Sequence, residues 1–244
     1  LEGRDLAFLG GGLYNNVDLV ELADGRVIVA ASDRTDPATA HLLIATLDTA
    51  SAKLTRIARI EVGEGEGYGV CMGAPAADGT VDIFSAPKEG VIYRTQVRLA
   101  ADGSGATGST SVLTTVPSQP EGCVVDPRTN TLYIGEEAAG IWAIDMRSGD
   151  KELVATVDNK MLVADVEGLA LAPEGTDGGY LVASSQGDNA YAVYKLPGME
   201  PLGRFRIAQG TLGATEETDG IGLRTGSFGP DYPAGLFVAQ DGIN

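Results

Sequence analysis

An acidic residue followed by glycine recurs along this chain at nearly regular intervals, each time before an apolar stretch with strand preference. The four steps are Glu66-Gly67, Glu121-Gly122, Glu167-Gly168 and Asp219-Gly220. Their spacings are 121−66 = 55, 167−121 = 46 and 219−167 = 52 residues. Asn15-Asn16-Val17-Asp18 followed by Arg26–Ala30 repeats the pattern without the glycine. The repeat predicts that one supersecondary unit is built several times over.

Each step predicts a β-hairpin. After Glu121-Gly122, the chain turns at 126–130, returns through Leu132-Tyr133-Ile134 and ends in Glu136-Glu137. The strands of a hairpin are antiparallel, so Glu121 and the Glu136-Glu137 pair should face one another at one edge of the sheet. A period of roughly 40 to 50 residues with several strands per unit is typical of β-propeller blades. The sequence therefore predicts an all-β propeller with about four and a half blades, and a β-sandwich is the alternative fold.

The acidic residues of the repeat converge on one face in this arrangement. The chain carries 34 acidic and 17 basic residues, a formal charge of −17. Such a surface repels nucleic acid and anionic membranes. Clustered carboxylates repel one another by roughly 3 kcal/mol per pair at about 5 Å and an effective dielectric near 20, so the cluster requires a cation. Oxygen ligands favour Ca²⁺ over Zn²⁺.

Further side chains join this face. Asp165 and Glu167 are two positions apart in extended chain and point to the same side. Arg34 and Lys88-Glu89 follow second strands, where a cation can hold a phosphate or carboxylate. The chain has one histidine, His41, which makes histidine-based catalysis and histidine-bound zinc improbable. Cys71 and Cys123 occupy similar places in successive repeats; two buried free thiols are the favoured interpretation, and a disulfide is the alternative.

From Asn15 to Asn244 the sequence resembles the β-propeller phytases, the calcium-dependent alkaline phytases. The similar segments include Asn15–Asp18, Ala30–Arg34, Leu132–Glu137, Asp165–Gly168, Ala183–Gly187, Thr218–Gly220 and Gly235–Gly242. The resemblance implies a six-bladed propeller with several calcium ions. It also implies hydrolysis of phytate or calcium phytate by direct attack of metal-activated water, without a covalent enzyme intermediate.

The resemblance also assigns roles by position. The acidic calcium site comprises Glu121, Glu137, Asp165, Glu167, Gln186 and Asp219. Asn16, Val17 (through its carbonyl) and Asn244 correspond to structural calcium sites. Arg34, Tyr68, Lys88 and Glu89 correspond to positions around bound phosphates, and Glu121, Tyr68, Arg34 and Lys88 are the predicted catalytic group.

Residues 1–244 are predicted to form a single phytase-like domain, incomplete at both ends, which resembles the truncated first domain of tandem phytases. A second phytase domain in the same polypeptide is thus an expected partner, whereas nucleic acid and membranes are not. The family resemblance implies a secreted or periplasmic protein. A catalytically weak calcium- or phosphate-binding module and a calcium-dependent lactonase are the alternative functions.

Overall fold

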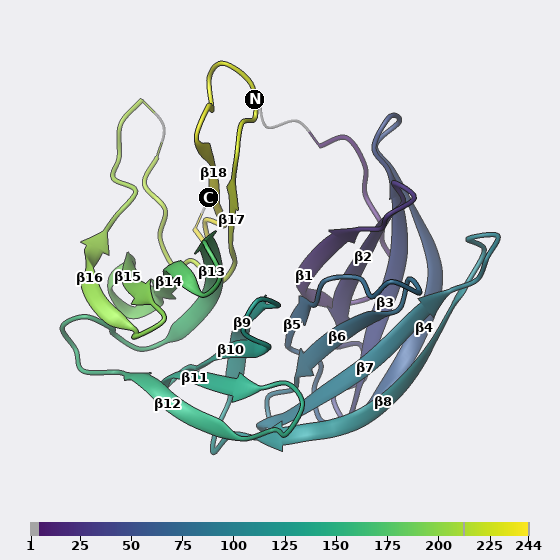
Figure 1. Cartoon of the computed structure of the whole chain (residues 1–244), viewed down its shortest axis with the longest axis horizontal. Coiled ribbons are helices and arrows are strands. Elements are labelled where there is room, and N and C mark those ends of the chain that lie inside the picture. Colours follow the sequence, from purple (N-terminus) through teal and green to yellow (C-terminus); the bar gives the residue numbers. More distant parts are fainter. Residues whose placement is uncertain (1–4, 212, 244) are drawn as a thin grey trace. The chain divides into compact units, whose positions relative to one another are not determined.

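The computed structural model describes residues 5–211 and 213–243, and these residues are almost entirely β-strands and turns (Figure 1). The single helical element among them is the 3-10 turn η1 (Gln186–Asp188). The chain divides into two compact units, residues 1–115 and residues 116–244. No helix in the described residues has the length and apolarity needed to cross a membrane. The prediction that residues 1–244 form one domain remains a prediction.

Unit 1 contains two four-stranded antiparallel sheets, and the strands of each lie side by side in chain order. The first sheet contains β1 (Tyr14–Glu21), β2 (Val27–Asp33), β3 (Thr39–Asp48) and β4 (Lys53–Glu64). The second contains β5 (Gly69–Met72), β6 (Val81–Ala86), β7 (Val91–Leu99) and β8 (Ala106–Thr115). One apolar core joins the two sheets, and its members include Ile28, Leu42, Ile44, Val70, Ile83 and Val97.

Unit 2 contains two more sheets of the same kind and a two-stranded sheet. The first contains β9 (Pro120–Asp126), β10 (Thr131–Glu136), β11 (Gly140–Asp145) and β12 (Lys151–Thr156). The second contains β13 (Val166–Glu174), β14 (Gly178–Ser185), β15 (Ala190–Leu196) and β16 (Glu200–Phe205). The hairpin of β17 (Ile221–Thr225) and β18 (Gly235–Ala239) follows. The apolar core of unit 2 includes Tyr133, Ile141, Leu162, Leu181 and Tyr194.

Burial differs between the inner and the outer strands of each sheet. Five of the six residues of β10, the second strand of its sheet, are buried, whereas the outer strands β8 and β16 expose most of their residues. A strand covered on both faces needs a nearly continuous apolar run, and a strand at the outer edge does not. Meandering four-stranded sheets that follow the chain order are propeller blades rather than halves of a sandwich, so the all-β propeller prediction is confirmed.

The glycine of the repeated step has a steric reason. A Cβ on Gly122 would lie 2.1 Å from the carbonyl oxygen of Glu167, and one on Gly168 would lie 2.6 Å from the carbonyl oxygen of Asp219. The Gly168 amide donates to that same Asp219 oxygen at 2.6 Å. In unit 2, the first strand of one sheet therefore passes so close to the first strand of the next that a side chain does not fit there.

The predicted turn at 126–130 also holds unit 2 together. Asn130 adopts a φ of 58°, in the left-handed region that suits a turn. Arg128 binds the Asp126 carboxylate, and its Nη1 donates to the carbonyl oxygens of Glu174 at 3.1 Å and Gly178 at 2.9 Å. Arg128, held by the buried Asp126 carboxylate, thus ties the β9–β10 turn to the β13–β14 turn.

The prediction of free thiols was wrong, because Cys71 and Cys123 are both disulfide-bonded. Repeat spacing places the two residues at equivalent strand positions, but it does not give the Cα separation and Cβ direction that decide whether a disulfide closes.

Candidate active site

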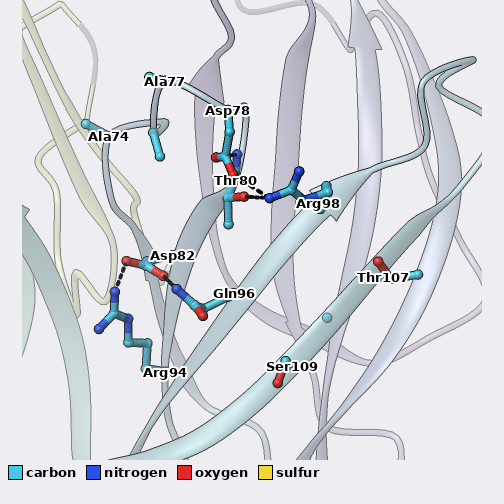
Figure 2. A pocket seen from close by; sticks show the side chains of 12 residues that line it. Ala74, Ala77, Asp78, Thr80, Asp82, Arg94, Gln96, Arg98, Thr107 and Ser109 are labelled. Atoms are coloured by element: carbon cyan, nitrogen blue, oxygen red, sulfur yellow. Dashed lines mark hydrogen bonds and ion pairs between the residues drawn. The ribbon is translucent and has the colours of Figure 1, made fainter.

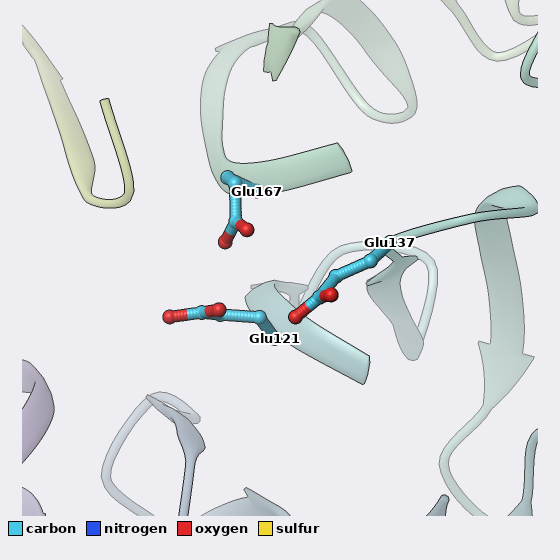
Figure 3. Close-up of side chains that lie close together, drawn as sticks. All are labelled: Glu121, Glu137 and Glu167. Carbon is cyan, nitrogen blue, oxygen red and sulfur yellow. The ribbon is translucent and has the colours of Figure 1, made fainter. Parts of the chain in front are cut away.

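Three glutamates from the starts and ends of strands in unit 2 converge, and we call them the glutamate cluster: Glu121, Glu137 and Glu167 (Figure 3). Glu121 lies on β9, Glu137 directly follows β10, and Glu167 lies on β13. Each offers a carboxylate oxygen within 4.8 Å of the other two. Glu121 and Glu167 are buried and Glu137 is partly exposed. Glu121 and Glu137 thus lie close together at one edge of the sheet, as the predicted hairpin requires.

Electrostatics in the glutamate cluster disfavour ionisation. Burial, and then the charges of Glu121 and Asp165, raise the pKa of Glu137 to about 7. Burial also raises the pKa of Glu167, and its contacts with Glu121 and Glu137 raise it further. Without a bound cation, the surroundings of the cluster therefore do not stabilise all three carboxylates in the ionised form at neutral pH.

Asp165, Gln186 and Asp219 surround the cluster. The Gln186 side-chain amide donates to Asp219 Oδ1 at 2.7 Å, and the Gln186 backbone amide donates to the Asp165 carbonyl at 3.0 Å. Burial and the charge of Glu121 raise the pKa of Asp219, so that carboxylate also faces the cluster. The structure therefore groups all six predicted ligands of the acidic calcium site on one part of unit 2.

Glu136 does not belong to this group, although the hairpin argument paired it with Glu137. Its Oε1 accepts hydrogen bonds from the amide and the hydroxyl of Ser118, and its Oε2 accepts one from Trp142 Nε1 at 2.7 Å. Adjacent strand residues point to opposite sides. Glu136 is consequently a buried structural carboxylate. Sequence reasoning missed Gln119, whose side-chain amide donates to Glu137 Oε1.

The glutamate cluster fits a calcium ion on its own chemistry. Its donors are carboxylate oxygens, the ligand type that Ca²⁺ prefers. Glu167 Oε2 is buried, and no hydrogen-bond partner reaches it in the described structure. A buried carboxylate oxygen without a donor is costly, and a cation would satisfy it.

A second group of predicted residues meets in unit 1, and we call Arg34 and Lys88 the cation pair. The Arg34 guanidinium carbon lies 5.2 Å from the centre of the Tyr68 ring, and Lys88 Nζ lies 4.5 Å from it. Glu66 contacts both cations. It begins one of the four acid-glycine steps, but it is not among the residues predicted to bind calcium or phosphate. Glu89 has an exposed side chain, and its Oε2 accepts the Glu66 amide at 3.0 Å.

The predicted structural calcium ligands Asn16 and Val17 lie at an irregularity of β1. The pairing register with β2 shifts between Tyr14 and Val17, as in a β-bulge. The Asn16 amide donates to Ser32 Oγ at 3.0 Å, and the Val17 side chain is 64% exposed. Asn244, the third predicted structural ligand, lies outside the described residues.

Two surface cavities are lined by residues of unit 1. A cavity of about 760 Å³ on the second sheet is lined by the ion pairs Arg94–Asp82 and Arg98–Asp78 and contains none of the predicted site residues (Figure 2). Another cavity, of about 770 Å³, is lined by Phe8–Tyr14, Arg34 and Glu66. Of the predicted phosphate-binding residues, Arg34 lines the second cavity.

Comparison with known proteins agrees with this geometry. Residues 1–244 match the phytase family. The chain belongs to the phytase family. It is also 33% identical, over 259 aligned positions, to the 3-phytase of Bacillus subtilis (strain 168), and the alignment covers 100% of this chain and 67% of that protein. The resemblance drawn from the sequence motifs is confirmed, and the chain is an enzyme of the phytase family.

Proposed function

We propose that this chain hydrolyses the phosphomonoesters of phytate, or of its calcium complex, in a calcium-dependent reaction. The observation that carries the proposal is the convergence of Glu121, Glu137 and Glu167 within 4.8 Å in a member of the phytase family. Phosphate groups carry about −1.5 to −2 charges near neutral pH. An acidic site needs cations before it can accept such a substrate.

The glutamate cluster would hold calcium, with Asp165, Gln186 and Asp219 as further oxygen ligands. Calcium bound there supplies positive charge that offsets the carboxylates and the substrate phosphate, and it makes water a better nucleophile. In the proposed reaction, water attacks phosphorus directly, the P–O ester bond breaks, and inorganic phosphate and the inositol alcohol leave. The role of Glu121 is to bind metal and not to act as a nucleophile.

The cation pair has a separate role in the proposal. Arg34 and Lys88 bind phosphate oxygens through charge-assisted hydrogen bonds. Tyr68 supports both cations with the face of its ring. Asn16 and the carbonyl of Val17 belong to a structural calcium site, where the bulge of β1 turns the backbone.

Phosphate release from calcium phytate tests the proposal, with calcium titrated against a chelator. Glu121→Gln should lower the rate by about 100-fold or more, because it removes a charged ligand from the metal site. Glu152→Gln, on an exposed position of β12, makes the same charge change and should leave the rate within about twofold. Activity of the wild type in excess chelator would contradict calcium dependence.

Two further outcomes separate the alternatives. A trapped phosphorylated side chain would contradict direct attack by water. Calcium and phosphate binding without turnover would instead favour a binding module, and hydrolysis of a lactone in place of phytate would favour a lactonase.

A further inference from the structure

Glu66 lies between the two cations that are predicted to bind phosphate. Arg34 Nε donates to Glu66 Oε1 at 2.6 Å, and Arg34 Nη2 binds the same oxygen. The other oxygen, Oε2, lies 3.4 Å from Lys88 Nζ. One carboxylate therefore contacts both cations, one with each oxygen. Arg34 Nη1 also donates to Asn15 Oδ1 at 3.5 Å.

The backbone of Glu66 is fixed at both ends of the residue. Its amide donates to Glu89 Oε2 at 3.0 Å, and its carbonyl accepts the Lys88 amide at 3.3 Å. These contacts join the segment before β5 to the turn after β6. The position of the Glu66 carboxylate is thus set by the chain and not only by the cations.

The glycines on either side of Glu66 make this fit possible. Gly65 has a φ of 111°, and a Cβ there would lie 2.2 Å from Glu89 Oε2. A Cβ on Gly67 would lie 2.8 Å from the carbonyl oxygen of Asp33, the residue before Arg34. Only glycine lets this loop between β4 and β5 approach both neighbours so closely. The motif therefore places an acid between residues 34 and 88.

Electrostatics indicate what the carboxylate does there. Arg34 and Lys88 both lie close to the Tyr68 ring and both contact the Glu66 carboxylate, and two like charges so near each other repel. Burial would raise the pKa of Glu66, but the hydrogen bond from Arg34 and the charges of both cations outweigh burial and lower it. Glu66 stays ionised and offsets the repulsion within the cation pair.

We infer that Glu66 is a positioning residue that holds Arg34 and Lys88 side by side over Tyr68, so that one phosphate group of the substrate can contact both. The inference rests on the proposed function of the cation pair. Arg34 and Glu66 both line the cavity of about 770 Å³, so a ligand in that cavity can reach Arg34.

The sign of the mutational effect separates positioning from simple charge. A carboxylate beside an anion site repels the anion, so its removal without a positioning role would tighten anion binding. Glu66→Gln should instead weaken binding of myo-inositol hexasulfate, a non-hydrolysable polyanion, by about tenfold, because the pair loses its fixed geometry. Calorimetric titration at fixed calcium measures this affinity.

Two further variants complete the test. Glu61→Gln removes an exposed acid of β4 and should bind hexasulfate within about twofold of the wild type. Glu66→Asp keeps the charge but shortens the reach, and its affinity should fall between those of the wild type and Glu66→Gln. Equal or tighter binding by Glu66→Gln, or an Asp variant weaker than the Gln variant, would overturn the inference, provided that thermal melts show each variant folded.

Steady-state kinetics separate this inference from the proposed function. In Glu66→Gln, KM for calcium phytate should rise about tenfold while kcat stays within about twofold, the pattern for loss of uniform binding. A loss confined to kcat would overturn positioning. If the wild type releases no phosphate, the proposed function fails, but the hexasulfate affinities still decide the role of Glu66.

Discussion

The glutamate cluster of unit 2 and the cation pair of unit 1 shift the pKa values of their glutamates in opposite directions. Glu137 and Glu167 are surrounded by carboxylates, and burial and those neighbours raise their pKa values. Glu66 lies against Arg34 and Lys88, and its pKa is lowered despite burial. The first arrangement gains stability when a cation arrives from solution. The second is neutralised largely within the protein and can accept an anion.

The two sites should therefore differ in how much their stability depends on bound calcium. Three carboxylates within 4.8 Å repel by about 3 kcal/mol per pair at an effective dielectric near 20, and a cation that binds only the folded state recovers this energy. Calcium should consequently raise the Tm through the glutamate cluster, while the ion pairs of Glu66 should hold with or without it.

The largest loss of stability should come from placing a side chain between β9 and β13, the strands that carry Glu121 and Glu167. Gly122→Ala places a Cβ about 2 Å from the Glu167 carbonyl oxygen, so β9 and β13 must separate. We expect a loss of about 3 kcal/mol or more, or a fall in Tm of about 6 °C or more, measured by thermal melting.

Gly220→Ala is the matched control for that change. Gly220 also follows an acid of the repeat, but a Cβ there meets nothing within 4 Å. Its Tm should stay within about 2 °C of the wild type. Equal destabilisation by the two alanines would contradict the steric reason given for the repeated glycine.

A sign reversal should distinguish the two sites next. Glu167→Gln in excess chelator should raise the Tm by about 3 °C, since a neutral glutamine avoids the free-energy cost of protonating Glu167 when the metal-free chain folds near neutral pH. At saturating calcium the same variant should melt below the wild type, since it has lost a ligand. Glu66→Gln should lower the Tm by about 2 °C in both conditions. A Glu167→Gln variant that melts lower in both conditions would show that the carboxylate is structural.

The smallest effect should be the pH dependence of the metal-free protein. The folded pKa of Glu137, about 7, lies above its ordinary value of 4.5, so the folded state binds more protons than the unfolded state between these values. The Tm in chelator should fall as the pH rises from about 5 to 8, and Glu137→Gln should reduce that fall. A Tm that rises over this range in chelator would contradict the cause assigned to the shift.

Sequence reasoning reached the repeat, the hairpins and the meeting of Glu121 with Glu137 because strand direction and period follow from local pattern. The hairpin pattern alone did not separate Glu136 from Glu137, because their side chains differ in which side of the strand end they take, and only the family resemblance selected Glu137. The disulfide state of Cys71 and Cys123 was also beyond it, since spacing does not give Cβ directions. The role of Glu66 required the proximity of residues 34, 66 and 88, which only tertiary structure provides.

Calcium binding by the metal-free chain tests the central claim most directly. Calorimetric titration of calcium into the wild type, Glu167→Gln and the exposed control Glu152→Gln would compare the number of sites and their affinities. The glutamate cluster predicts at least one site in the wild type and in Glu152→Gln that Glu167→Gln loses or binds about 10-fold to 100-fold more weakly. Identical titrations for the wild type and Glu167→Gln would contradict it.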